Sequence, residues 1–81
     1  MIFPCEFVLK IMGKVDAKLE LAIVPTLERN IADMTKVEIT SRMSKGGKFT
    51  AVTVTFMADS QEQLDNIYRE LTARPDVLMV L

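Results

Sequence analysis

The sequence contains no histidine, no tryptophan and a single cysteine, Cys5. Without an imidazole, the Ser-His and Cys-His pairs of nucleophilic enzymes cannot form, and a structural zinc ion lacks its usual ligands. A lone cysteine on the apolar side of a strand is far more often a small buried hydrophobe than a reactive thiolate. These absences predict a protein that is not an enzyme and that carries no metal ion and no cofactor.

A surplus of positive charge is also missing, because ten Lys and Arg face eleven Asp and Glu, for a formal net charge of −1. A sequence-independent nucleic-acid binder needs such a surplus to release counterions, so no nucleic-acid partner is expected. The longest run without a charged residue, 49–58, is half of a membrane span, and residues 1–6 lack the basic start of a signal peptide. Together with a cysteine that has no partner in the chain, these features predict a cytoplasmic protein that does not enter a membrane.

What the sequence does contain is an alternation of strand and helix patterns in a chain of 81 residues, the size of one domain. Apolar residues at every second position predict strands over 3–12, 36–44 and 49–58, and an apolar run predicts a last strand over 77–81. Gly13 is expected to end the first strand. The side chains expected on the core side of the first three strands are Phe3, Cys5, Phe7, Leu9, Ile11, Val37, Ile39, Met43, Val52, Val54 and Phe56.

The clearer of two helical patterns follows the third strand. Its apolar stripe consists of Leu64, Ile67, Tyr68 and Leu71. Ser60 and Gln63 have the spacing of a capping box at its start, and Pro75 ends it. On its solvent side, the spacing predicts ion pairs Asp65–Arg69 and Glu70–Arg74.

The other helical pattern follows the first strand, with Asp16 as its expected N-cap. Its apolar stripe consists of Leu19, Ala22, Ile23 and Leu27. Pro25 interrupts the pattern, because a proline inside a helix removes a backbone hydrogen bond and clashes with the preceding turn. We expect either a kink near Leu21 or a break after which Pro25 restarts a turn.

The resulting order β-α-β-β-α-β predicts an α+β fold of the ferredoxin-like, split βαβ type, with a four-stranded antiparallel sheet and two helices on one face. The other face stays open, and six side chains are expected on it: Lys10, Met12, Thr40, Arg42, Thr53 and Thr55. RNA-recognition domains of this topology stack bases on aromatic rings of the central strands. Thr53 and Thr55 offer no ring there.

Between the second and third strands, Gly46 and Gly47 supply the positive φ angles of a tight hairpin. Glycine N–H groups with cations nearby also favour anions, so Arg42, Lys45, Gly46, Gly47 and Lys48 form a candidate anion-binding or partner-binding group. The spacing of a phosphate-binding loop is not met. The favoured interpretation is structural: the glycines turn the chain, and Lys36, Arg42 and Lys45 protect an edge strand from other chains.

Three segments together resemble the YbeD-like (UPF0250-type) family of small uncharacterised bacterial proteins. The residues that carry the resemblance are Phe3-Pro4-Cys5-Glu6-Phe7 through Lys10-Ile11-Met12-Gly13, then Ser44-Lys45-Gly46-Gly47-Lys48-Phe49, then Val77-Leu78-Met79-Val80-Leu81. The resemblance implies an ACT-like fold, as in the regulatory domains that sense amino acids beside metabolic enzymes, and the family is described as lipoate-binding and regulatory.

ACT-type domains hold ligands near the turn after the first strand, often at a dimer interface. The resemblance therefore carries Gly13, Lys14 and Asp16 forward as ligand-binding candidates. It implies a non-enzymatic regulatory module that binds a small acid, such as lipoate or an amino acid, or a partner enzyme, as a homodimer. The alternative is a protein–protein interaction module that uses the open sheet face or the last strand and takes no small ligand.

Overall fold

The structure, a computed structural model, describes residues 2–14, 18–43 and 46–81. The elements, in chain order, are β1 (Cys5–Lys14), α1 (Leu19–Ala22), α2 (Val24–Asn30), the 3₁₀ helix η2 (Met34–Lys36), β2 (Glu38–Met43), β3 (Phe49–Ala58), α3 (Gln61–Thr72) and β4 (Val77–Val80). The predicted order of strands and helices is confirmed, with the first helix in two pieces. No helix in the described parts of the chain is both long and apolar enough to span a membrane.

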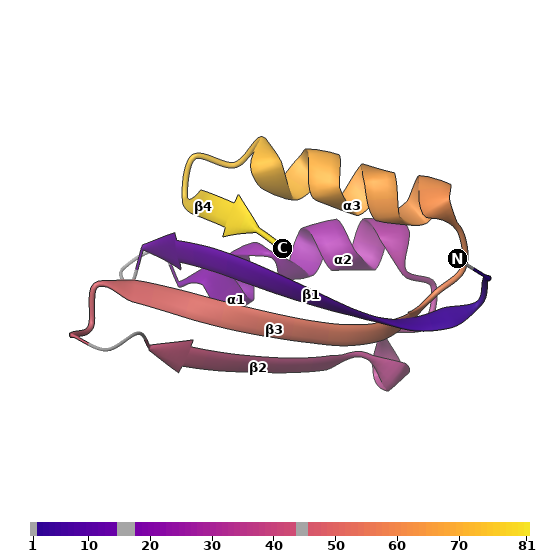
Figure 1. Ribbon diagram of the computed structural model, residues 1–81, viewed down its shortest axis with the longest axis horizontal. Coiled ribbons are helices and arrows are strands. Elements are labelled where there is room, and N and C mark those ends of the chain that lie inside the picture. Colours follow the sequence, from indigo (N-terminus) through magenta and orange to yellow (C-terminus); the bar gives the residue numbers. More distant parts are fainter. Residues whose placement is uncertain (1, 15–17, 44–45) are drawn as a thin grey trace.

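The four strands form one sheet in the order β2-β3-β1-β4, and every neighbouring pair is antiparallel. Figure 1 shows the helices together on one side of this sheet, with α3 running along β1 and β4. Because both crossovers are right-handed in such folds, their helices return to the same face. The predicted α+β, ferredoxin-like fold is confirmed.

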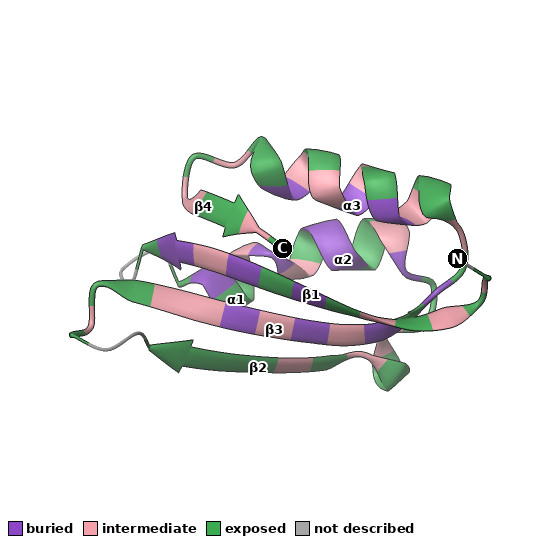
Figure 2. Cartoon of the chain, in the orientation of Figure 1, coloured by how far each residue is buried: buried purple, intermediate pink, exposed green. Residues whose placement is uncertain are grey.

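The core lies between the helices and the inner face of β1 and β3, along which buried residues alternate with intermediate or exposed ones (Figure 2). The buried apolar residues are Leu9, Ile11, Leu19, Ile23, Leu27, Ile31, Val52, Val54, Phe56, Ala58, Leu64, Ile67 and Leu71. Most of the predicted core is confirmed. Met43 is the exception: it is 60 % exposed, because β2 is an edge strand and the buried core residues come from β1, β3 and the helices.

The first helix breaks at Ile23, and Pro25 lies in the first turn of α2, where its missing N–H is not needed. The break was one of the two outcomes expected from the sequence. Leu19 and Leu27 still face the core, one on each side of the break. Lys18, with φ 49° and ψ 52°, occupies the N-cap of α1, so the expectation that Asp16 caps this helix is wrong. Asp16 itself lies outside the described residues.

Gly13 does not end the first strand as expected, because β1 continues through it to Lys14. It is buried and pairs with Thr50 of β3. A Cβ built on Gly13 would lie 2.5 Å from the carbonyl oxygen of Asp76 and 3.0 Å from a methyl carbon of Leu19. Glycine is therefore needed here for close packing inside the sheet, rather than for a turn.

The pairing of β4 with β1 contains an irregularity beside this glycine. Val80 pairs with Ile11, whereas Val77 pairs with Gly13, so one extra residue of β4 is accommodated between them. A bulge of this kind shifts the alternation of side chains along the strand. As a result, both Val77 and Val80 pack against the core, which a regular strand of four residues would not allow.

The predicted capping box of α3 is half confirmed. The Ser60 hydroxyl accepts a hydrogen bond from the Gln63 N–H at 3.1 Å. The Gln63 side chain accepts from the Asp59 N–H at 2.7 Å rather than from Ser60, and it also donates to the carbonyl of Asn30 at 2.8 Å. One glutamine therefore joins the start of α3 to the end of α2.

Both predicted ion pairs of α3 are wrong. Glu70 instead accepts hydrogen bonds from Arg29 Nε at 2.8 Å and from Asn30 Nδ2 at 2.6 Å, both of them at the end of α2. Arg74 forms two hydrogen bonds with Asp76 in the turn before β4, at 3.0 and 3.1 Å. Glu70 and Arg74 therefore bond to partners brought close by the tertiary fold or the turn. Asp65 instead accepts from Gln61 Nε2 at 3.0 Å, and Arg69 donates to Asn66 Oδ1 at 3.4 Å, both within α3.

Candidate functional site

The sheet face opposite the helices carries the best candidate site. Strand register fixes which side chains meet there: Lys10 and Thr40 both pair with Thr53, one from each side of β3. In the next row of the sheet, Arg42 pairs with Ala51. Neighbouring side chains on one face of a sheet are about 4.5 to 5.5 Å apart at Cβ, so these groups form a compact cluster.

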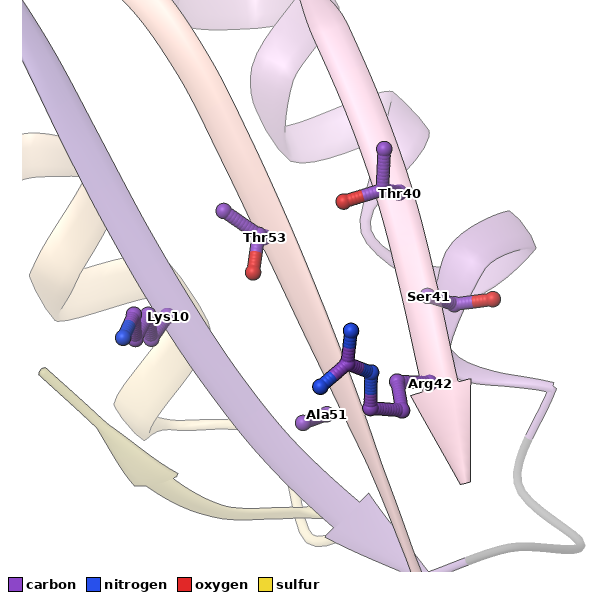
Figure 3. A pocket seen from close by; sticks show the side chains of 6 residues that line it. All are labelled: Lys10, Thr40, Ser41, Arg42, Ala51 and Thr53. Atoms are coloured by element: carbon purple, nitrogen blue, oxygen red, sulfur yellow. The ribbon is translucent and has the colours of Figure 1, made fainter. Parts of the chain in front are cut away.

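A shallow depression of about 340 Å³ lies over this cluster. Its lining residues are Lys10, Thr40, Ser41, Arg42, Ala51 and Thr53, and we call it the open-face depression. Figure 3 shows the Arg42 side chain reaching from β2 over β3, with Lys10 on the far side of β3. The Ser41 hydroxyl points away from the other polar groups.

The electrostatics of the open-face depression favour an anion. Lys10 and Arg42 are both exposed, and neither forms an ion pair with any carboxylate in the described part of the chain. Thr53 lies on β3 between their strands and Thr40 lies on β2 with Arg42, and both hydroxyls can donate or accept a hydrogen bond. A guanidinium can hold a carboxylate through two parallel hydrogen bonds, and an ammonium adds a second positive charge.

The candidates near the hairpin are not all brought together. Gly46 and Gly47 have φ of 91° and 70°, which confirms the positive φ angles expected of them. Gly46 is exposed with open space around its Cα, Lys48 is exposed, and Lys45 lies outside the described residues. Of the four described members of this group, Arg42 alone lines the open-face depression.

The candidates after the first strand are also separated. Gly13 is enclosed by Leu19 and the backbone of Asp76, so its role in the structure is packing. Lys14 ends β1, is exposed, and pairs with Phe49 beyond the open-face depression. Asp16 is not among the described residues. Cys5 is a free, half-buried thiol packed against the core, as expected of a small hydrophobe.

Sequence reasoning placed Lys10, Thr40 and Thr53 on the open face but did not assign them to a site. The alternation of each strand was visible in the sequence. The missing signal was the register between strands, which brings Lys10 beside Thr53 across 43 positions of sequence. Ser41 gave no signal at all, because its parity places it on the other face.

Among the residues that the structure describes, three carboxyl groups have a lowered pKa, and all three lie outside the open-face depression. Hydrogen bonds from Asn30 and then Arg29 lower the pKa of Glu70. Hydrogen bonds from Arg74 lower that of Asp76, and hydrogen bonds from the Thr35 hydroxyl and N–H lower that of Asp33. These hydrogen bonds stabilise the charged form of each carboxylate. The carboxylate of Glu70 connects α3 to α2, that of Asp76 lies in the turn before β4, and that of Asp33 lies at the N-cap of η2.

The chain matches one family over its whole length: residues 1–81 match the family described as "Protein of unknown function (DUF493)". The chain belongs to this family. Relatives of this DUF493 chain include the UPF0250 protein of Chromobacterium violaceum, 44 % identical over 79 residues, which cover 98 % of this chain and 89 % of the relative. The UPF0250 protein of Paraburkholderia phytofirmans is 47 % identical over 81 residues, with the same two coverages. The resemblance to the YbeD-like, UPF0250-type family is thereby confirmed.

Solved structures agree on the fold. The solution structure of protein HP0495 from Helicobacter pylori has a TM-score of 0.71 and 16 % identity, and the match covers 100 % of the DUF493 chain and 85 % of that protein. The C-terminal domain of MgtC from Mycobacterium tuberculosis has a TM-score of 0.64 and 12 % identity, covering 94 % and 82 %. At such identities the likeness concerns the fold alone, which is the α+β, ferredoxin-like arrangement expected from the order of strands and helices.

Proposed function

We propose that this DUF493 protein is a small non-enzymatic regulatory module of the cytoplasm that binds a small carboxylic acid, such as an amino acid or lipoate, at the open-face depression. The observation that carries the proposal is the position of two cations, Lys10 and Arg42, on either side of Thr53 without an acidic partner among the described residues. The lack of histidine and the single half-buried thiol support a binding role rather than a catalytic one.

The chemistry of the cluster suits a carboxylate with an apolar remainder. The Arg42 guanidinium and the Lys10 ammonium supply charge, and the Thr53 hydroxyl lies between them to fix orientation. Ala51, in the next row, offers apolar surface beside the cations. Lys14 stays a further candidate, because it lies two positions beyond Met12 on the same side of β1.

Thermal unfolding with a panel of amino acids, lipoate and related acids tests the proposal. A ligand at ten times its Kd adds about 1.4 kcal/mol, which raises the Tm of a domain this small by roughly 5 to 10 °C. Lys10→Met and Arg42→Met should each abolish the shift. Lys48→Met, an exposed cation outside the depression, is the matched control and should leave the shift intact. A shift that survives both site variants would place the acid elsewhere and refute this siting.

A second candidate function is binding of a partner protein, and one observation favours it. The edge strand β4 exposes about half of each of two apolar side chains, Leu78 at 49 % and Met79 at 50 %, followed by Leu81 at 61 %. A partner enzyme could add a strand to this edge. If no acid shifts the Tm and a partner captured by the wild-type protein is lost with Met79→Lys, this function would replace acid binding.

A further inference from the structure

The sheet has a second open edge, and its charges are arranged in a way that the acid site does not explain. β2 pairs with β3 on one side, and in the described parts of the chain no strand pairs with its other side. All residues of β2 except Ile39 are exposed. An edge of this kind presents backbone N–H and C=O groups that can pair with another strand.

The charges of β2 are symmetric in position and opposite in sign. Glu38 lies two residues before Thr40 and Arg42 two residues after it. All three lie on the open face, because they pair with Thr55, Thr53 and Ala51 of β3. An antiparallel partner strand runs in the reverse direction, so a second copy aligned on Thr40 would bring its Arg42 opposite Glu38, and its Glu38 opposite Arg42.

We propose that β2 is the interface of a homodimer in which a second copy pairs antiparallel to it, with the two-fold axis at Thr40. The two four-stranded sheets then form one continuous sheet, and two Glu38–Arg42 ion pairs bridge the copies. A two-fold interface is self-complementary by definition, and this strand carries a self-complementary charge pattern.

The other face of β2 agrees with the same alignment. It brings Met43, which is 60 % exposed in the single copy, opposite Val37 of the second copy. Val37 already packs against the core, so the exposed methionine gains an apolar neighbour at the edge of an existing apolar cluster. Burial of exposed apolar surface is the usual source of stability in such a contact.

Other alignments lose these pairs. A shift that places Ser41 on the axis brings Arg42 opposite Thr40, so neither ion pair forms. Positive charges of one sign would protect the edge, because they would repel the same charges on a second copy. β2 also carries the carboxylate of Glu38. In the register centred on Thr40, and in no other, Glu38 lies opposite Arg42 of the second copy and attracts it.

Charge reversal tests the pairing. Sedimentation from micromolar to millimolar concentration should show a monomer–dimer equilibrium that Glu38→Arg and Arg42→Glu each weaken roughly tenfold or more, because two attractions become two repulsions. The double variant E38R/R42E should restore it, since the pairs re-form with exchanged signs. Glu6→Lys, on the same face but in β1, is the matched control and should change nothing.

Cross-linking tests the register. Directly paired residues on antiparallel strands have Cα atoms about 4.5 to 5.5 Å apart, which a disulfide can span. In a Cys5→Ser background, Thr40→Cys should therefore form a disulfide-linked dimer faster than Ser41→Cys. A protein that stays monomeric at millimolar concentration, or a double reversal without recovery, would overturn the dimer, and faster linkage through Ser41→Cys would overturn its axis.

The proposal does not rest on acid binding. Arg42 belongs to both sites, so a bound acid and Glu38 of the second copy would compete for one guanidinium. The sedimentation experiment is therefore carried out in a buffer without small carboxylic acids, so that no acid competes with Glu38 for Arg42. If the protein is monomeric but an acid still raises its Tm, only the dimer proposal is refuted. If the protein is dimeric and no acid raises its Tm, only the acid-site proposal is refuted.

Discussion

Replacing Gly13 with alanine should destabilise the protein although the side chain added is a single methyl group. The new Cβ would lie 2.5 Å from the Asp76 carbonyl oxygen, a distance that real Cβ atoms essentially never show. The oxygen belongs to the backbone of the turn into β4, so relief requires the strand to move rather than a side chain to rotate. A methyl carbon of Leu19, at 3.0 Å, is a second close neighbour of the added methyl group.

The magnitude follows from two opposing effects. Overpacking of a buried position costs about 1 to 3 kcal/mol, whereas replacing a glycine inside a strand returns about 0.5 to 1 kcal/mol of backbone entropy. The net loss of up to about 2.5 kcal/mol lowers the Tm of a domain of this size by up to roughly 20 °C. Thermal unfolding followed by circular dichroism measures it.

The place where the structure loosens distinguishes a steric clash at Gly13 from a non-specific effect of replacing a glycine. In Gly13→Ala, amide exchange should accelerate at Val77 and Leu81, whose N–H groups bond to Arg74 and Lys10 around β4. Gly46→Ala is the matched control: it has φ of 91° and open space, so its effect should stay in the hairpin. An unchanged Tm with unchanged exchange in β4 would refute the reasoning.

Three further predictions follow from the helices. Ser60→Ala removes the cap of Gln63 N–H and should cost about 0.5 to 2 kcal/mol in chemical denaturation, whereas Ser41→Ala on exposed β2 should have little effect; equal losses would contradict the cap. Ile67→Val, at a fully buried position, should cost about 0.5 to 1.5 kcal/mol in the same assay, and no loss would contradict tight packing under α3. The pKa of Glu70 is lowered in the folded state from an ordinary 4.5, so its stabilisation is present above that pH and is lost as pH falls through the lower folded value; the stability gap to Glu70→Gln should therefore be widest at neutral pH and close on acidification, and a gap independent of pH would contradict the ion pair.

Periodicity was enough to predict β3 and α3, because their apolar residues repeat without interruption and their ends carry a turn or a cap. It also predicted that Pro25 would disturb the first helix, but not whether by a kink or a break. Ile23, the cap shared by α1 and α2, keeps helical φ and ψ of −85° and −15°, so both pieces keep their buried residues in the core.

Two of the wrong predictions share one physical cause, which is proximity created by tertiary structure. Glu70 has a plausible partner four residues away, yet Arg29, 41 positions distant, lies closer in the folded chain. Gly13 looked like a strand end, since the approach of the Asp76 backbone leaves no mark in the sequence. For the same reason, the sequence predicted that Lys10 and Arg42 lie on the open face but not that they lie close together. Their proximity depends on the register between strands.

The central position of β1 has a kinetic consequence. Only the β2–β3 hairpin joins strands that are neighbours in sequence, whereas β1 lies between β3 and β4, which both come from the other half of the chain. Loop-closure entropy must therefore be overcome before β1 gains any partner, which slows folding relative to helical proteins of equal stability. A circular permutant that begins at η2 keeps the β2–β3 hairpin, and a linker from β4 to β1 would make the β1–β4 contact local as well. It should fold faster while its native sheet stays the same.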